Sequence, residues 1–197
     1  MNTPNKLTIL RICIVPFMIA ALLIEFPLHF LVAGLLFGAA SITDYFDGKI
    51  AREKGLITDF GKFADPLADK ILVISCLVCF VAMGLCDPVL VIIVLFREFT
   101  ITSIRLVAAA KGTIIAANIW GKLKTVTQII AIIGVFVFQL FLELCKLGLI
   151  PLSAEVTDML APWLTVAGMV LLWISTVFAI ISGIIYVKDN KDCIRDM

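Results

Sequence analysis

The stretch DYFDGKIAREKGLITDFGKFADPLADK, residues 44–70, decides how this chain is organised. It holds six acidic residues, among them Asp44, Asp47, Asp65 and Asp69, in a protein of 197 residues that is 62% hydrophobic. Charge at this density is costly beside a lipid bilayer and usually marks a functional site. The sequence on either side indicates that a bilayer is where this stretch lies.

The flanking sequence predicts an all-α integral membrane protein. Several long runs contain no Asp, Glu, Lys or Arg, and a helix needs roughly 20 mainly apolar residues to cross a hydrocarbon core of ~30 Å. The runs do not alternate polar and apolar residues, as the strands of a membrane barrel would. We expect one domain over residues 1–197, a bundle of six transmembrane helices with an interfacial N-terminal segment. The predicted spans are Leu7–Ile24, Phe26–Thr43, Ile71–Cys86, Pro88–Ala110, Thr125–Leu142 and Met159–Val187.

The distribution of basic residues predicts the orientation of this bundle. Six spans place both termini on one side of the membrane, together with the loops near residues 44–65 and 106–124. That side carries twelve Lys and Arg residues, whereas the opposite loops carry only Lys146. Because basic residues are retained inside, we expect a multi-pass protein of the cell membrane with cytoplasmic termini and a cytoplasmic aspartate-rich loop. We expect membrane lipids as partners and no nucleic acid.

The four aspartates form two pairs at helical spacing. Asp44 and Asp47 end the second span and lie three residues apart, so they share a helix face. Asp65 and Asp69 lie four apart at the start of the third span, where Asp65 suits the cap position and Pro66 the first turn. Two antiparallel helices joined by a short loop would bring both pairs to the same depth in the membrane.

Four carboxylates in one place repel one another unless cations lie between them. Oxygen ligands favour Mg²⁺, Mn²⁺ or Ca²⁺, and paired metals recur in displacement reactions at phosphorus. Gly48 and Ala51 leave room for a ligand to approach the helix, and Arg52 is placed to pair with a phosphate. The alternative, solvated charges or helix caps, explains one aspartate better than it explains two pairs. The pattern therefore favours a metal-dependent site for a polyphosphate at the membrane surface.

The motif resembles the signature of the CDP-alcohol phosphatidyltransferase family. DYFDGKIAR at residues 44–52 and GKFADPLAD at residues 61–69, with eight residues between them, carry every signature residue at the expected spacing. The resemblance implies transfer of a phosphatidyl group from a CDP-linked lipid to an alcohol, with release of CMP. It also implies two divalent cations, Mg²⁺ or Mn²⁺, and a homodimer.

The resemblance also implies residue roles. Asp44, Asp47 and Asp65 would hold one metal, and Asp44, Asp65 and Asp69 the other. Asp69 would also act as general base on the acceptor hydroxyl. The residues expected to contact CDP-diacylglycerol are Gly48, Arg52 and Thr58, together with Asn5 and Thr8 of the opening segment. An interfacial helix start would use Asn5 and Thr8 equally well.

Other segments bear on the acceptor alcohol. MNTPNKLTILRI at the start, Arg97–Glu98 and the segment from Gly121 to Gln128 resemble bacterial members that use sn-glycerol 3-phosphate and form phosphatidylglycerophosphate. That acceptor is a dianion, so we expect Arg105, Lys122 and Lys124 to bind its phosphate. The two lysines could instead enforce topology and bind anionic headgroups. Arg97 and Glu98 fit a structural ion pair as well as a substrate contact.

Other functions are weaker interpretations of the same residues. Within the family, the acceptor could be phosphatidylglycerol, inositol phosphate or serine. A divalent-cation transporter would need polar residues that continue across the membrane, whereas the runs beyond the aspartates are apolar. A scaffold without catalysis leaves the four aspartates unexplained. Cys76 and Cys79 form a C-x-x-C pattern inside an uncharged helical run, where packing is the simpler role.

Overall fold

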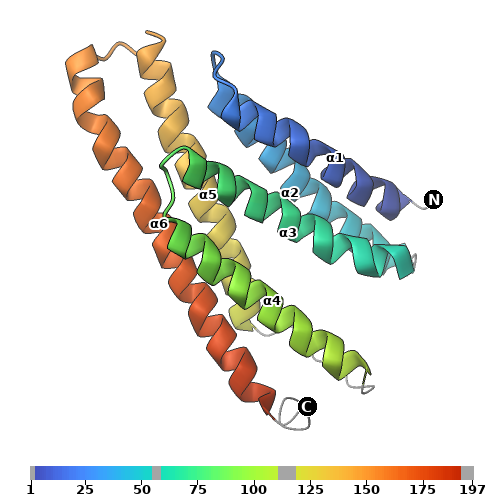
Figure 1. The fold of residues 1–197 in the computed structure, drawn as a ribbon. Helices are drawn as coiled ribbons and strands as arrows, with labels where there is room; N and C mark the ends of the chain where they lie inside the picture. The colour runs from blue at the N-terminus through green and yellow to red at the C-terminus, as the bar shows by residue number, and fades with distance from the viewer. Residues whose placement is uncertain (1–2, 55–58, 111–118, 192–197) are drawn as a thin grey trace.

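The structure is a computed structural model that describes residues 3–54, 59–110 and 119–191. Within the helices, the side chains of residues 3–4, 44–54, 59–63, 65–66 and 110 are not described. The described residues form six α-helices and no strands (Figure 1). The helices are α1 (Thr3–Leu23), α2 (His29–Lys54), α3 (Asp59–Ala82), α4 (Pro88–Ala110), α5 (Ile119–Lys146) and α6 (Ala154–Asp189).

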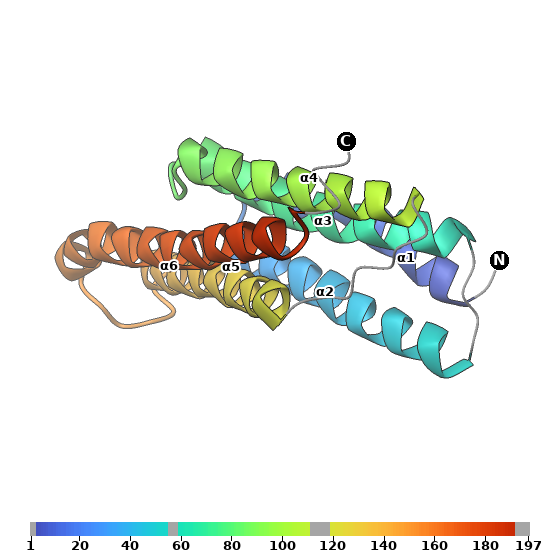
Figure 2. The same ribbon diagram turned by 90° about the horizontal axis from the view of Figure 1, so that it is seen from below.

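The helices form a bundle in which α1 packs against both α2 and α3, and α5 packs along α6. α4 packs against α6 and α3, while α2 reaches α5 (Figure 2). Successive helices run in opposite directions, so α1 begins and α6 ends at the same end of the bundle (Figure 1). The end of α2 and the start of α3 also lie there. The aspartate motif, at the end of α2 and early in α3, therefore lies at the end of the bundle where α1 starts and α6 finishes.

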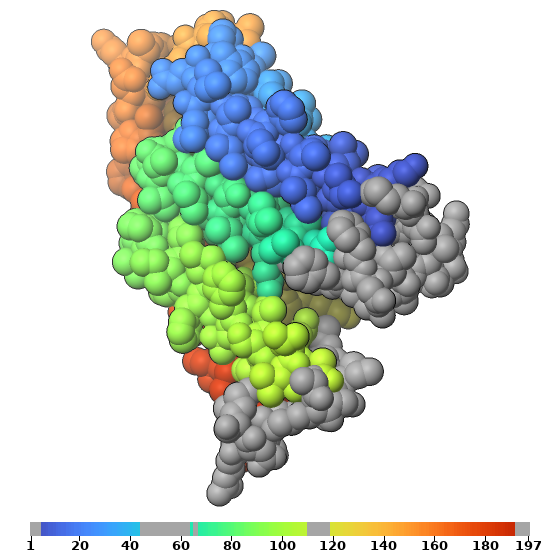
Figure 3. Space-filling model, turned by 45° about the vertical axis from the view of Figure 1, so that its right-hand side comes forward, coloured from blue at the N-terminus to red at the C-terminus, as the bar shows by residue number. Residues whose placement is uncertain are grey.

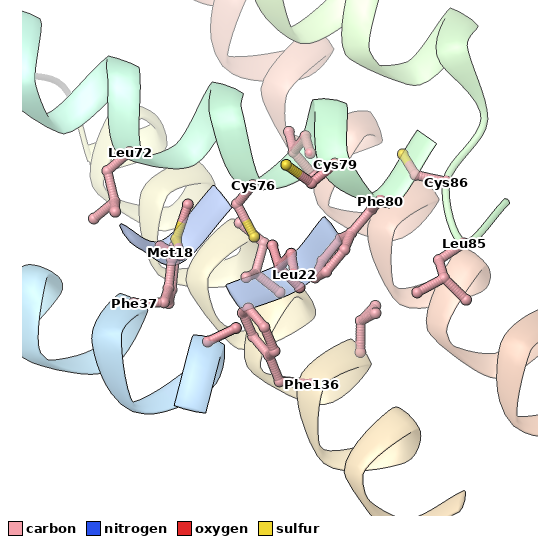
Figure 4. Close-up of a cluster of buried hydrophobic side chains, with 14 of the residues drawn as sticks. Met18, Leu22, Phe37, Leu72, Cys76, Cys79, Phe80, Leu85, Cys86 and Phe136 are labelled. Atoms are coloured by element: carbon pink, nitrogen blue, oxygen red, sulfur yellow. The ribbon is translucent and has the colours of Figure 1, made fainter. Parts of the chain in front are cut away.

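An apolar core joins the bundle away from that end. Met18 and Leu22 of α1, Phe37 of α2, and Cys76 and Phe80 of α3 are buried around Phe136 of α5 (Figure 4). The Phe136 ring centre lies 5.3 Å from that of Phe80 and 5.8 Å from that of Phe37. Such close aromatic contacts contribute beyond the area that they bury. Cys76 and Cys79 are buried free thiols, as the packing interpretation predicts.

Side chains cap the helices at the end of the bundle away from the motif. Asp87 accepts a hydrogen bond from Val89 N–H at 2.8 Å, so α4 begins at Pro88 as predicted. A proline suits a first helical position because its missing N–H needs no partner there. Glu143 of α5 accepts from the N–H groups of His29 and Phe30 at 3.0 and 3.3 Å. The carboxylate of a distant helix therefore satisfies donors that α2 itself leaves unpaired.

The outer faces of the helices are apolar, as a lipid environment requires. α1, α3 and α4 lie side by side on the face in Figure 3, and outward side chains of these helices include Phe17, Val78 and Phe96. Three described helices are long and apolar enough to cross a membrane: Asn5–Leu23, Ile119–Lys146 and Ala154–Asp189. The chain therefore has the helices of a membrane protein. The six-span count remains a prediction, because the other described helices carry more charge or shorter apolar runs.

One predicted helix boundary was wrong at the motif. α3 begins at Asp59, so Asp65 lies inside the helix and is not its cap. The segment ahead of Pro66 is long enough to add helical turns, and a proline inside a membrane helix is tolerated where neighbouring groups satisfy the freed carbonyl. α1 begins at Thr3, so residues ahead of the predicted span Leu7–Ile24 belong to the same helix.

Candidate active site

A cavity of about 910 Å³ lies between α3, α4 and α5 and is bordered by the end of α6. In α4 and α5 the polar lining residues recur three or four residues apart, the spacing that places them on one face of a helix. Its charged lining is Asp69 and Lys70 from α3, Arg97, Glu98 and Arg105 from α4, and Lys122 and Lys124 from α5. Thr102, Gln128 and Tyr186 add neutral polar groups.

Glu98 joins α4 to α5 in the wall of the cavity. Its Oε1 accepts hydrogen bonds from Arg97 Nη1 at 2.8 Å and from Lys124 Nζ at 2.7 Å. Arg97 Nη2 also donates to Ser182 Oγ of α6 at 2.7 Å. The side chains of Arg97 and Glu98 are only 12% and 15% exposed, and that of Lys124 is 7% exposed. Of the two roles left open for Arg97 and Glu98, the structure shows the ion pair, extended to a third charge.

Charge-assisted hydrogen bonds of this kind hold their partners firmly when water is excluded. Lys124 was predicted to bind the acceptor phosphate, and it lies in the cavity wall, but Glu98 offsets part of its charge. The carboxylate of Asp69 is also close enough to act on Lys124 electrostatically. Lys124 therefore links the Glu98 network with the aspartate motif.

Arg105 and Lys122 have a different setting, because both are exposed. Arg105 Nε donates a hydrogen bond to the hydroxyl of Tyr186 at 3.2 Å, and its guanidinium carbon lies 5.6 Å from the centre of that ring. The three residues predicted to bind phosphate thus line the same cavity, one within a buried network and two at its exposed part.

Sequence reasoning missed two residues of this cavity, Lys70 and Tyr186. Lys70 follows Asp69 directly, and its ammonium donates to the Thr102 hydroxyl of α4. Tyr186 is buried near the end of α6. The signal for Lys70 was its place beside the motif on the same helix. Nothing in the apolar run that contains Tyr186 marks it as part of a site formed mainly by other helices.

Five of the predicted site residues lie where the structure describes only the backbone, and one lies outside the described residues. Asp44, Asp47, Gly48 and Arg52 belong to the last turns of α2. Thr58 falls in residues 55–58, outside the described part of the chain. Asp65 belongs to α3, and its side chain is likewise not described. Of the four motif aspartates, Asp69 is the one with a described side chain, and it lines the cavity.

Asn5 and Thr8 lie on α1, and neither is among the residues that line the described cavity. Asn5 is 7% exposed, and Thr8 and Arg11 are fully buried. The three residues are spaced three apart, so they form one polar face near the start of α1. Since α1 packs on both α2 and α3, this face lies at the end of the bundle that carries the motif.

The described side chains offer a ligand of the type that a divalent metal prefers, but not a complete set of ligands. Among them, no group of three His, Cys, Asp or Glu side chains is placed to hold a metal ion. Asp69 supplies one hard oxygen ligand in the cavity, and the remaining motif aspartates lie on α2 and α3 at the same end of the bundle. The donor type therefore suits Mg²⁺ or Mn²⁺.

Comparisons with known proteins agree with the motif. The sequence profile of the CDP-alcohol phosphatidyltransferase family matches residues 1–181. A CDP-diacylglycerol--glycerol-3-phosphate 3-phosphatidyltransferase of Bacillus subtilis is 35% identical over 98% of this chain and 97% of its own length. A protein of the same name from Rickettsia bellii is 34% identical over 96% of each chain.

A probable phosphatidylglycerophosphate synthase of Mycobacterium tuberculosis is 41% identical over 71% of this chain and 67% of its own length. The similarity to the first two relatives covers nearly the whole chain, so it extends well beyond the aspartate motif and includes the helices that line the cavity. The chain belongs to the CDP-alcohol phosphatidyltransferase family.

Proposed function

We propose that this chain transfers a phosphatidyl group from CDP-diacylglycerol to sn-glycerol 3-phosphate. The products are phosphatidylglycerophosphate and CMP, so the activity is that of a CDP-diacylglycerol–glycerol-3-phosphate 3-phosphatidyltransferase. The family and the names of near full-length relatives support the reaction. The single structural observation that carries the acceptor is the cavity in which Asp69 shares a wall with basic side chains from α4 and α5.

The charges of the cavity support a phosphorylated acceptor. Its described lining contains five basic side chains, Lys70, Arg97, Arg105, Lys122 and Lys124, against two acidic ones, Asp69 and Glu98. A neutral alcohol gains nothing from this excess of positive charge, whereas a phosphate dianion is stabilised by it. Arg105 and Lys122, which are exposed, form the first contact for that phosphate, and Lys124 forms the inner wall.

Members of this family generally use a divalent metal. For this chain we propose two cations, Mg²⁺ or Mn²⁺, one held by Asp44, Asp47 and Asp65 and the other by Asp44, Asp65 and Asp69. Metals at such a site offset charge on the pyrophosphate and on the leaving group. The helical spacing of the two aspartate pairs supports this ligand set.

Asp69 is the proposed general base. The acceptor hydroxyl oxygen forms a bond to the phosphorus that carries the diacylglycerol, and the bond from that phosphorus to the bridging pyrophosphate oxygen breaks. The hydroxyl proton passes to the Asp69 carboxylate, and the electron pair of the broken bond leaves on CMP. The position of Asp69 in the wall that also carries Lys124 supports this role, because the acceptor phosphate and its hydroxyl would be held together.

The CDP-lipid would occupy the side of the motif nearest α1. Gly48, Arg52 and Thr58 are proposed to contact the nucleotide and its phosphates, with Asn5 and Thr8 beside them. The buried polar face near the start of α1 supports this assignment. Buried polar groups are retained where they have partners, and α1 packs against both helices that carry the motif.

We further propose that residues 1–197 form one membrane domain with six spans in the cell membrane. Its termini and active site face the cytoplasm, where both the nucleotide and glycerol 3-phosphate would be available, and two copies form a homodimer within the membrane lipids. The strong bias of basic residues supports the orientation. The antiparallel arrangement of the described helices supports the placement of both termini on one side.

The decisive experiment measures CMP release from CDP-diacylglycerol in detergent micelles with Mg²⁺ or Mn²⁺. Glycerol 3-phosphate, glycerol, phosphatidylglycerol, inositol phosphate and serine are offered singly. We expect release with glycerol 3-phosphate only. Release with another acceptor would retain the chemistry and overturn the phosphate site. Release with none of them, combined with metal flux into proteoliposomes, would replace the transferase with a divalent-cation transporter.

A further inference from the structure

Tyr186 lines the cavity, and the reaction as described so far gives it no role. It lies close to the end of α6, and it is the residue that α6 contributes to the lining of the described cavity. Its side chain is 4% exposed and packs with Ile101 and Ile104 of α4 in a small apolar cluster separate from the main core. A phenol ring fixed in this way presents its hydroxyl and one ring face in a constant position.

Arg105 lies against both of these features. Its Nε donates to the Tyr186 hydroxyl at 3.2 Å, and its guanidinium carbon lies 5.6 Å from the ring centre, within the range of a cation–π interaction. Among the residues that the structure describes, the guanidinium makes no other hydrogen bond. The two terminal nitrogens, Nη1 and Nη2, take no part in the contacts with Tyr186, and they form the fork that suits a phosphate.

Tyr186 holds Arg105 from a fixed position, although Arg105 itself is exposed. Tyr186 is buried, and its carbonyl accepts a hydrogen bond from Asn190 Nδ2 at 2.8 Å, which closes the end of α6. An exposed arginine samples many rotamers, and ordering it on binding costs free energy. An arginine already held at Nε and over a ring loses less freedom when its terminal nitrogens take up a phosphate.

We infer that Tyr186 is a positioning residue that orients the Arg105 fork toward the acceptor phosphate and thereby selects a phosphorylated acceptor. The inference rests on the proposed function. It adds α6 to the acceptor site and assigns the hydroxyl and the ring to separate tasks. The hydroxyl sets the rotation of the guanidinium, and the ring keeps its plane near the cavity wall.

The test uses the full chain in micelles and compares the KM values of the two substrates. Tyr186→Phe removes the hydroxyl and retains the ring. We expect the KM for glycerol 3-phosphate to rise roughly tenfold, the loss of one hydrogen bond to a charged group. The KM for CDP-diacylglycerol and kcat should change less than about twofold, because a positioning role concerns the acceptor alone.

A double-mutant cycle separates positioning from packing. Arg105→Lys keeps the positive charge but loses the Nε–H donor and the planar fork, so it should raise the same KM. Adding Tyr186→Phe to Arg105→Lys should then raise it less than about twofold further. Thr176→Val is the matched control, since it removes a buried hydroxyl of α6 whose hydrogen bond, among the described residues, goes to Leu172 O of the same helix. It should leave both KM values unchanged.

Three results would overturn the inference while the proposed function stands. One is an unchanged KM for glycerol 3-phosphate in both Tyr186→Phe and Arg105→Lys. Another is an equal rise in both KM values, accompanied by a lower thermal midpoint, as a purely structural role requires. The third is an undiminished effect of Tyr186→Phe in the Arg105→Lys background. If the wild-type chain releases no CMP with glycerol 3-phosphate, the proposed function fails, and the inference fails with it.

Discussion

One face of α5 is buried along its length, but it carries polar residues in the first half of the helix and apolar residues in the second. Near the start of the helix the buried residues are Lys124 and Gln128, and one to two turns further on they are Ala131, Ile132, Val135 and Phe136. The spacing continues from one half to the other, so the same face turns inward throughout. The first half borders the charged cavity, and the second packs into the apolar core (Figure 4).

The same division occurs in α3, where Asp69 and Lys70 precede Leu72, Cys76 and Phe80. Helix periodicity thus determines which side chains face inward. The position along the helix determines whether these side chains border the charged cavity or the apolar core. Polar groups line the cavity, and the residues further along each helix pack into the apolar core. Substitutions in the two halves should therefore affect activity and stability separately.

The largest expected effect on activity is that of Asp69→Asn at the cavity. The amide cannot take the acceptor proton and is a poorer ligand for a divalent cation, so we expect the rate of CMP release to fall at least about 10³-fold. The thermal midpoint in micelles should change little, because the side chain is partly exposed. CMP release and thermal unfolding are measured on the same preparation.

Asp87→Asn is the matched control in the loop before α4. Its side chain caps α4 through Val89 N–H, and asparagine caps a helix about as well as aspartate. This variant should retain full activity. Comparable losses in the two variants would contradict the division between the two halves.

The next effect is on stability, from Phe136→Ala in the apolar core. Phe136 is 5% exposed and contacts rings from two other helices, so its truncation leaves a cavity that the bundle cannot fill. We expect a loss of about 3 kcal/mol, measured as a lower midpoint of thermal or denaturant unfolding in micelles. The rate per folded molecule should remain near that of the wild type.

Phe96→Ala provides the comparison on the outer surface, where Phe96 is 74% exposed. In a membrane this ring contacts lipid, and its loss leaves no cavity between helices. The variant should unfold at the wild-type midpoint. A large loss of stability there would show that the Phe96 face is packed against another protein surface.

The sequence predicted six spans, and the residues that the structure describes form six helices. It also predicted the start of α4. Charge-free runs and a proline after an aspartate are local signals. The sequence also predicted that Arg105, Lys122 and Lys124 would act together, and all three line one cavity. The start of α3, which carries the second half of the aspartate motif, was predicted less well. α3 begins at Asp59, two turns ahead of Pro66, because a proline can also lie inside a membrane helix and so does not by itself mark the start.

The partners of charged residues were the least predictable part of the site. The Glu98 carboxylate could have bound Arg97 alone, and its bond to Lys124 depends on how α4 and α5 are placed beside each other. The contact of Arg105 with Tyr186 joins residues 81 positions apart in the sequence. Periodicity within a single helix carries no information on either contact.

The smallest expected effect tests how closely α5 and α6 pack in the apolar half. A Cβ atom at Gly168 of α6 would lie 3.1 Å from Val135 Cγ2 and 3.9 Å from Val135 Cα, whereas a Cβ at Gly38 of α2 would meet nothing within 4 Å. Small residues allow membrane helices to approach closely, and Gly168→Ala requires the Val135 side chain to shift by a few tenths of an ångström. Both substitutions gain up to about 1 kcal/mol of helix propensity.

The pair of variants therefore isolates the packing cost at the α5–α6 contact. Gly38→Ala should raise the thermal midpoint, and Gly168→Ala should leave it unchanged or lower it, with a difference between them of about 1–2 kcal/mol. CMP release should be unaffected in both, because neither position borders the cavity. Equal thermal midpoints for the two variants would mean that the Val135 side chain can shift without loss of stability. A loss of activity in Gly168→Ala alone would mean that the approach of α5 to α6 also places Lys124, and the two halves of α5 would then be coupled.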